Sequence, residues 1–259
     1  MSSRNPKPTP KPDPPPGLYA RPELYDLVHW DGTEAEVDLL EKLHARHGNG
    51  GKRCLEPACG TGRYLRVLFR RGWKTAGYDS NGKMLAYARR RLPGADLAAA
   101  DLRTFRRPAA YDLAFCLQST FRHLLTEADA LAHLRGTAAS LRPRGLYVIG
   151  MDLADYSRAL DDEEVFESAR RGMRARHVMF SVAPDRKRRR ERIISFTSVE
   201  KNGGNETISD EYDIRSYDRG EFRRLIAASP FHLERVYDLF GVPRGLSAIT
   251  VNAIVVLRL

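Results

Sequence analysis

A glycine-containing turn between an apolar run and a helix pattern is the stretch of this sequence best suited to binding a ligand. Residues 54–62 read Cys-Leu-Glu-Pro-Ala-Cys-Gly-Thr-Gly, and a helix pattern follows over residues 63–71. Gly60 and Gly62 let the chain bend sharply and let a ligand approach the main chain, which a Cβ atom would obstruct. A dinucleotide would favour a third glycine at position 65, where this chain has Leu65. The turn therefore predicts a cofactor other than a nicotinamide or flavin dinucleotide.

Acidic residues stand at or near the ends of the first three expected strands, at Glu56, Asp79 and Asp101. An open parallel sheet places a strand-end carboxylate where it can receive two ribose hydroxyls, and Asp79 occupies that position. The sequence contains no G-x-x-x-x-G-K-[ST] loop for a nucleoside triphosphate. These acids fit a nucleoside that carries a positive charge, and the sulfonium S-adenosylmethionine meets that description.

Short apolar runs separated by helix patterns must position these residues. Five runs are typical of strands in a parallel sheet: residues 52–57, 74–79, 96–101, 111–117 and 146–152. Residues 22–47 carry apolar side chains at helical spacing and predict two helices. Thr126 and Asp129 predict the capped start of another helix. We expect an α/β fold with a doubly wound, mostly parallel sheet of seven strands.

The pattern changes to antiparallel β structure after the fifth run. Five more runs predict strands, three before the next helix and two after it: residues 177–183, 192–201, 208–217, 232–240 and 247–257. Asp218, with Glu221 three residues later, predicts the start of that helix. Residues 154–217 therefore resemble a small antiparallel insertion, which we expect to lie over the ligand edge of the large sheet.

Composition limits the protein class. The 259 residues are 42% hydrophobic and 29% charged, which is typical of a globular protein, and they contain no apolar run of membrane-spanning length. The first thirty residues lack the apolar run of a secretory signal, so we expect a cytoplasmic protein. Residues 1–16 hold seven of the fifteen prolines and predict an extended tail ahead of one domain over residues 17–259. The three cysteines, Cys54, Cys59 and Cys116, lack metal-site spacing and predict buried, reduced thiols and no metal centre.

The net charge of +10 makes nucleic acid a candidate partner. The excess lies in residues 51–100, on arginines of two expected surface helices, which is typical of solvated helix faces. The run from Arg186 to Arg192 could bind RNA or direct nuclear import, but it falls at an expected hairpin tip and favours a solvated loop. We therefore expect neither nucleic acid nor a membrane as partner, and the sequence makes no prediction of oligomeric state.

Three stretches resemble class I S-adenosylmethionine-dependent methyltransferases, and within them glycine N-methyltransferase and related small-molecule enzymes. They are residues 58–62, Asp79 with residues 83–88, and residues 116–124, and the order of elements extends the resemblance over about residues 19–259. The resemblance implies a cofactor site made by Glu56, Ala58, Gly60, Gly62, Asp79, Ser80, Met84, Asp101, Leu102, Leu117 and Gln118. For Asp101, capping of the following turn remains an alternative.

Two departures from the glycine enzyme's pattern limit what the resemblance implies for the substrate. Ser119 stands where that pattern has an asparagine, and Ala154 stands where it has an arginine that clamps the substrate carboxylate. A carboxylate without a bidentate arginine loses both geometry and charge pairing. We therefore expect a substrate other than glycine.

Methyl transfer from a sulfonium needs little acid–base chemistry, because positioning alone contributes roughly 7–11 kcal/mol. His123 could accept a proton at neutral pH, although its place beside Leu124 also suits a packed histidine. We expect catalytic roles for His123 and Ser119 and substrate contacts from Thr120 and Tyr217. Tyr25 is expected on the cofactor side, and Tyr19 and Trp30 are further candidate aromatic walls or ordinary core residues.

The predicted function is methyl transfer from S-adenosylmethionine to a nitrogen or oxygen atom of a small molecule. An RNA or protein methyltransferase that uses the basic surface is one alternative. A module that binds the cofactor without turnover is another.

Overall fold

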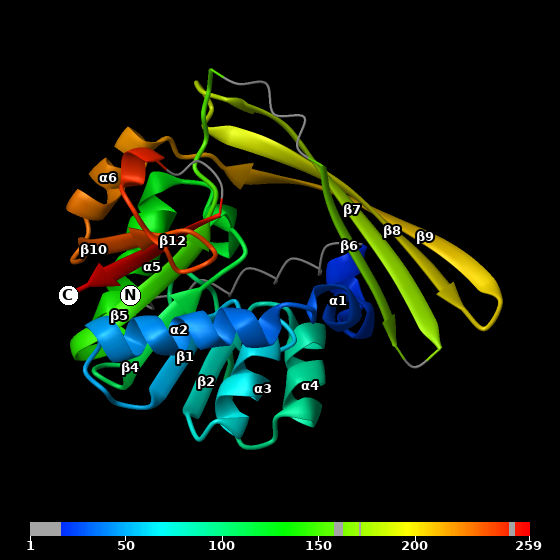
Figure 1. Ribbon diagram of the computed structural model, residues 1–259, viewed down its shortest axis with the longest axis horizontal. Coiled ribbons are helices and arrows are strands. Elements are labelled where there is room, and N and C mark those ends of the chain that lie inside the picture. Colours follow the sequence, from blue (N-terminus) through cyan, green and yellow to red (C-terminus); the bar gives the residue numbers. More distant parts are fainter. Residues whose placement is uncertain (1–16, 158–162, 171, 249–251) are drawn as a thin grey trace, which may run out of the picture.

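The computed structural model describes residues 17–157, 163–170, 172–248 and 252–259, so the proline-rich tail predicted for residues 1–16 lies outside the described residues. Figure 1 shows two β-sheets, a large one flanked by helices and a small one that extends away from it. No helix in the described ranges is long and apolar enough to cross a membrane.

The large sheet has the predicted doubly wound order, β11-β10-β12-β5-β4-β1-β2-β3. Its five parallel strands are β1 (Arg53–Pro57), β2 (Lys74–Asp79), β3 (Asp96–Ala99), β4 (Tyr111–Cys116) and β5 (Leu141–Met151). Three antiparallel strands complete it: β12 (Ala253–Arg258), β10 (His232–Tyr237) and β11 (Pro243–Arg244). The seven expected strands are thus present, and the two-residue β11 adds an edge.

Helices cover both faces of the large sheet (Figure 1). One face packs against α2 (Thr33–His47), α3 (Arg63–Arg70) and α4 (Gly82–Arg91), and the other against α5 (Glu127–Ser140) and α6 (Arg219–Ala227). Thr126 caps α5 by accepting a hydrogen bond from the Asp129 backbone N–H, and Asp218 and Glu221 form a complete capping box on α6. Both predicted helix starts are confirmed.

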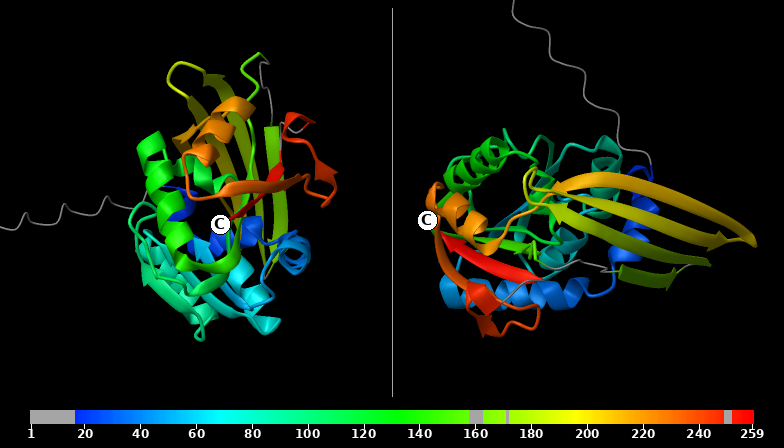
Figure 2. Two further views of the ribbon diagram at one scale, coloured as in Figure 1. Left: turned by 90° about the vertical axis from the view of Figure 1, so that its left-hand side faces the viewer. Right: turned by 90° about the horizontal axis from the view of Figure 1, so that it is seen from above.

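The small sheet has four antiparallel strands, where the sequence predicted three. They are β6 (Glu163–Arg170), β7 (Met173–Asp185), β8 (Arg190–Lys201) and β9 (Gly204–Arg215), and Figure 2 shows them projecting beyond the helices. The sequence missed β6 because most of its side chains are exposed, so charged residues hide the strand alternation. The sheet packs through Ala175 and Val199 on α1 (Pro22–His29) and η1 (Leu18–Ala20).

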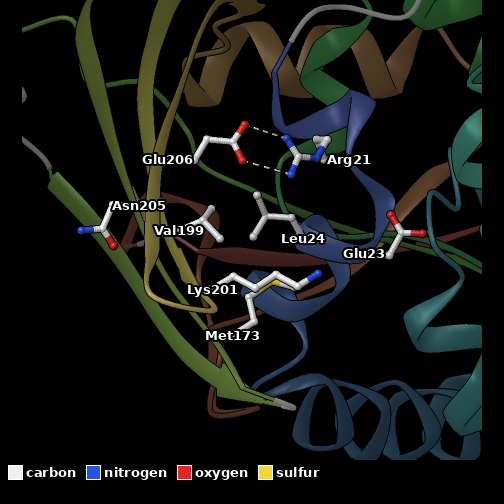
Figure 3. A pocket seen from close by; sticks show the side chains of 9 residues that line it. Arg21, Glu23, Leu24, Met173, Val199, Lys201, Asn205 and Glu206 are labelled. Carbon is white, nitrogen blue, oxygen red and sulfur yellow. Dashed lines mark hydrogen bonds and ion pairs between the residues drawn. The ribbon is translucent and has the colours of Figure 1, made fainter.

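A groove of about 440 Å³ lies along the contact between α1 and the far end of the small sheet (Figure 3). Leu24, Met173 and Val199 form its apolar floor, and an ion pair between Arg21 and Glu206, 2.9 Å long, lies beside it. None of the predicted site residues lines this groove.

The thiols of Cys54, Cys59 and Cys116 are buried and free, as predicted. Burial raises the pKa of the Cys116 thiol to about 12, so it stays protonated and unreactive at neutral pH. No cluster of candidate metal ligands occurs in the part of the chain that the structure describes.

The interpretation of Arg186–Arg192 as a solvated loop is only partly right. Arg186, Lys187 and Arg188 are exposed near the hairpin tip. Glu191, in contrast, is buried and pairs with Arg122, and Arg189 pairs with Glu127 at 2.7 Å. The second half of the run therefore belongs to the folded structure.

Candidate active site

The turn after β1 bends sharply, as the sequence predicted. Ala58, Gly60 and Gly62 all have φ in the left-handed region, at 50°, 50° and 69°. The Cys59 N–H donates to the carbonyl of Tyr78 on β2 at 3.0 Å, which fixes the turn against the neighbouring strand. A Cβ atom on Gly60 would meet the ring of Tyr25 at 4.0 Å, so α1 lies directly over the turn.

Asp79 joins the end of β2 to this turn. Its Oδ2 accepts a hydrogen bond from the Gly60 N–H at 2.8 Å, and its Oδ1 accepts one from the Asn81 N–H at 2.7 Å. Burial raises the pKa of this carboxyl group. Each oxygen keeps a lone pair, so the carboxylate can still receive two hydroxyl donors.

Glu56 provides a test of whether the residues fit a cationic cofactor. Its side chain is buried at the end of β1, and its Oε2 has no hydrogen-bond partner among the described residues. Burial raises the pKa of this carboxyl group well above its usual range. A buried acceptor without a partner is costly, and a ligand that carries a positive charge would satisfy it. The residues of this edge therefore fit S-adenosylmethionine.

The residues expected around adenine lie at the ends of β2 and β3. Ser80 is exposed beside Asp79, Met84 is buried in α4, and Leu102 is half-buried. Asp101 forms a bidentate ion pair with Arg103, at 2.8 and 2.7 Å, and accepts the Arg103 backbone N–H at 2.8 Å. The side chain thus caps the turn, which is the alternative role, and its contact with adenine stays a prediction.

The loop after β4 has a strained backbone. Gln118 and Ser119 adopt left-handed φ values of 55° and 53°, a conformation that costs about 1–3 kcal/mol per non-glycine residue. Leu117 is buried, and the Gln118 amide donates to Glu36 on α2 at 2.5 Å. Strain of this kind persists only where the surrounding contacts hold the loop, and it is concentrated at functional sites.

The hydroxyl of Ser119 is engaged by Asp152, which the sequence analysis did not single out as a site residue. It donates to Asp152 Oδ2 at 3.1 Å and accepts the Asp152 N–H at 3.2 Å, while Asp152 Oδ1 accepts the Asn252 N–H at 2.5 Å. A hydroxyl with its proton committed in this way is poorly placed to donate to substrate. This geometry does not favour the catalytic role expected for Ser119, which stays a prediction.

Four aromatic rings from distant segments meet beside the glycine turn, and we call Tyr19, Tyr25, His123 and Tyr212 the aromatic cluster. The rings of Tyr19 and Tyr25 lie 5.6 Å apart, and His123 stacks on Tyr212 at 5.4 Å. Tyr19 contacts both His123 and Tyr212 edge-on, at 6.3 and 6.0 Å. The sequence analysis missed Tyr212, which lies inside an expected strand without a distinguishing pattern.

His123 lines this cluster with one side open. The residue is exposed to solvent, yet desolvation by surrounding protein, helped by the charge of Arg122, lowers its pKa to about 4. The imidazole is therefore neutral at physiological pH and keeps a ring nitrogen that can accept a hydrogen bond. Thr120 is half-buried on the same short helix, η2 (Thr120–His123).

Tyr217 does not reach the site, so its predicted substrate contact is wrong. The side chain is fully buried and packs between Phe121 and Phe222 in the main core. Its residue lies beyond the end of β9 at Arg215, where the chain has turned toward α6. Trp30, the other candidate aromatic wall, contacts the guanidinium groups of Arg66 and Arg170 instead.

The glycine turn, the strand-end acids and the loop after β4 all lie at the carboxyl ends of the parallel strands, where open α/β sheets bind ligands. Residues 54–145 match the family described as a methyltransferase domain. The match, the fold and the buried, unpartnered Glu56 agree with an S-adenosylmethionine-dependent methyltransferase. The predicted class and cofactor are confirmed.

The chain is similar to enzymes that methylate aminosugars. A dTDP-3-amino-3,6-dideoxy-alpha-D-glucopyranose N,N-dimethyltransferase of Streptomyces fradiae is 36% identical over 130 residues, 49% of this chain and 51% of that protein. A dTDP-3-amino-3,4,6-trideoxy-alpha-D-glucopyranose N,N-dimethyltransferase of Streptomyces venezuelae is 27% identical over 238 residues, 86% of this chain and 93% of that protein. The structure of S-adenosylmethionine-bound CalS10, an amino pentose methyltransferase from Micromonospora echinaspora, has a TM-score of 0.69 at 24% identity, covering 88% of this chain and 91% of that chain. The chain thus spans about half of the first relative and most of the other two.

The finer resemblance to glycine N-methyltransferase has less support. A glycine/sarcosine N-methyltransferase of Aphanothece halophytica is 27% identical over 144 residues, 53% of each chain. The two aminosugar enzymes match either at higher identity or over more of the chain.

The arginines in and next to α3, which suggested a nucleic-acid partner, form ion pairs. Acidic side chains of α1 and α2 hold Arg63, Arg66, Arg70 and Arg71 in ion pairs. This surface is therefore closer to neutral than its arginine count implies, and the absence of a nucleic-acid partner stays a prediction.

Proposed function

We propose that this protein N-methylates the amino group of a nucleotide-linked aminosugar. The two curated aminosugar relatives support the substrate class, and the aromatic cluster beside the glycine turn is the observation that carries the proposal. Aromatic faces attract ammonium groups by about 0.5–2 kcal/mol, with the larger values where the cation is desolvated. An amine and its methylated cationic products both suit such a surface.

The position that a glycine enzyme would use to bind a carboxylate also supports this choice. Ala154 is buried, and its backbone N–H donates to the carbonyl of Tyr217 at 2.8 Å. This position therefore offers no cation to a substrate carboxylate, whereas an amine on a neutral ring needs none.

The chain's own residues divide the work between cofactor and acceptor. When bound, S-adenosylmethionine supplies an electrophilic methyl group on a sulfonium that becomes neutral as it leaves. Asp79 would receive the ribose hydroxyls and Glu56 would face the positively charged end. The small sheet, carried by residues 154–217, would bring Tyr212 over the acceptor from the opposite side.

His123 would orient the acceptor amine. As a neutral imidazole it can accept one N–H hydrogen bond and so direct the nitrogen lone pair at the methyl carbon. With a pKa of about 4, it has little capacity to carry the proton away at neutral pH. Catalysis would then rest on holding nitrogen and methyl about 3–3.5 Å apart.

Mass spectrometry of the reaction product tests the proposal. The protein is incubated with S-adenosylmethionine and a dTDP-linked 3-aminosugar, with glycine and the corresponding 3-hydroxy sugar as matched alternatives. We expect a gain of one or two methyl groups on the aminosugar alone. Methylation of the 3-hydroxy sugar or of glycine at a comparable rate would contradict it.

A further inference from the structure

A buried ion pair connects the loop of the active site to the small sheet. Arg122 belongs to η2, next to His123, and is 2% exposed, while Glu191 on β8 is 5% exposed. The Arg122 Nη2 pairs with the Glu191 carboxylate, and its Nε donates to the carbonyl of Arg215 on β9 at 2.9 Å. One side chain thus holds two strands of the small sheet.

The strands held by Arg122 also carry the acceptor side of the site. Tyr212 lies opposite Ile193 in the ladder between β8 and β9, two residues along β8 from Glu191. Its ring stacks on His123, the residue that follows Arg122. The ion pair therefore fixes the segment that carries His123 relative to the strand that carries Tyr212.

Stability alone does not explain a buried pair of this kind. Replacing a buried ion pair by apolar residues is often neutral or stabilising, because both charges lose their hydration. Its hydrogen-bond geometry, in contrast, fixes one arrangement of the two elements. The same segment begins with the strained residues Gln118 and Ser119, which need contacts to hold their conformation.

We propose that Arg122 and Glu191 are positioning residues that align His123 with Tyr212 for methyl transfer. The inference rests on the proposed function of the aromatic cluster. It also gives a role to the acidic residue within the arginine-rich run. Misplacement of reacting groups by about 1 Å can lower a rate by about 100-fold, so loss of the pair should reduce kcat more than it changes cofactor affinity.

The test compares Glu191→Gln, which removes the charge, with Glu191→Asp, which retains it. We expect Glu191→Gln to displace His123 and Tyr212 together and so to lower kcat by about 10- to 100-fold, more than loss of the His123 hydrogen bond alone. The Kd of S-adenosylmethionine should stay within about twofold of wild type. Glu191→Asp should recover part of the rate.

Asp112→Asn is the matched control, because Asp112 is a buried carboxylate at the opposite end of β4. It accepts the Arg53 N–H at 3.0 Å and pairs with Arg142 at 3.5 Å. This variant should lower the Tm and leave kcat unchanged. All variants are assayed well below the lowest Tm.

A second readout does not depend on the substrate. In protein with labelled histidine and tyrosine rings, nuclear Overhauser contacts between His123 and Tyr212 should be present in wild type, weak in Glu191→Gln and restored in Glu191→Asp. Unchanged contacts in Glu191→Gln would overturn the positioning role. If wild type fails to methylate aminosugars while Glu191→Gln still weakens these contacts, the proposed function is overturned and the positioning role stands. If Glu191→Gln lowers kcat no more than Asp112→Asn does, the ion pair is merely structural.

Discussion

The cofactor side and the acceptor side of this site are built from different parts of the chain. The proposed cofactor side consists of main-chain groups of one turn and the carboxylates that end β1 and β2, all within residues 56–81. The proposed acceptor side uses rings from η1, η2 and β9, with Tyr19 and Tyr212 far apart in the sequence. Tyr25 of α1, expected on the cofactor side, lies over Gly60 and also contacts Tyr19. The first depends on local geometry and the second on how distant elements pack.

This difference explains how one fold can serve many acceptors. Backbone donors and strand-end acids are fixed by the parallel sheet, so a change there would damage the sheet itself. Rings from the small sheet and the N-terminal helix can be exchanged while the sheet stays intact. Substitutions on the two sides should therefore have separable effects on cofactor affinity and on turnover.

Asp79→Ala should have the largest effect, and on the cofactor side. A hydrogen bond to a charged acceptor contributes roughly 1.5–3 kcal/mol, which corresponds to about 10- to 150-fold in affinity. Calorimetric titration with S-adenosylmethionine measures the change. Asp96→Ala is the control, because Asp96 is exposed on neighbouring β3 and pairs with Arg107. An affinity of Asp79→Ala within twofold of wild type would remove Asp79 from the ribose site.

The cofactor side could be predicted from the sequence because each of its signals is local. The glycine turn, Asp79 and the end of β1 are recognisable from a few neighbouring residues each. Even there, the sequence could not show that Arg103 occupies the Asp101 carboxylate, because a partner two residues away depends on the geometry of the turn.

The acceptor side could not be predicted in the same way. Tyr212 and Tyr217 both lie within one expected strand, residues 208–217. Only the end of β9 at Arg215 separates Tyr212, which joins the aromatic cluster, from Tyr217, which is buried in the core. Ser119 suggested a free hydroxyl, yet its partner Asp152 is 33 positions along the chain. Contacts of this range are set by tertiary packing, which propensity and spacing do not encode.

Tyr212→Ala should have the next largest effect, and on the acceptor side. Loss of one aromatic face removes about 0.5–2 kcal/mol of attraction for an ammonium group, or about 2- to 30-fold in kcat/KM for the aminosugar. Tyr212→Phe keeps the ring and should retain most of the activity. Tyr217→Phe is the control, because its buried hydroxyl has no partner among the described residues. If Tyr217→Phe lowers kcat/KM while Tyr212→Ala does not, the two tyrosines have been assigned the wrong way round.

His123→Asn should have a smaller effect, below about tenfold in kcat, because orientation by one hydrogen bond contributes about 1 kcal/mol. The pKa of about 4 keeps the imidazole neutral above pH 6, so its own titration should not shape the rate between pH 6 and 9. In that range the rate should rise with pH as the substrate ammonium loses its proton, in wild type and variant alike. If the pH–rate profile of wild type shows a rise with a midpoint near pH 6.5 that His123→Asn lacks, His123 is instead a base with an ordinary pKa.

Replacing Arg186, Lys187 and Arg188 together by serine should have the smallest effect. All three side chains are exposed, and the Arg188 contact with Asp185, at 3.8 Å, is a surface pair of little energetic value. Turnover and Tm should therefore stay close to wild type. Arg189→Ser, one residue further on, removes ion pairs with Glu127 and Glu221 at 2.7 and 3.2 Å and should lower the Tm. Because these four residues are consecutive, the contrast places the border between solvated loop and folded scaffold within a single residue. A loss of turnover in the triple variant that salt reproduces in wild type would show instead that the exposed cations attract an anionic substrate.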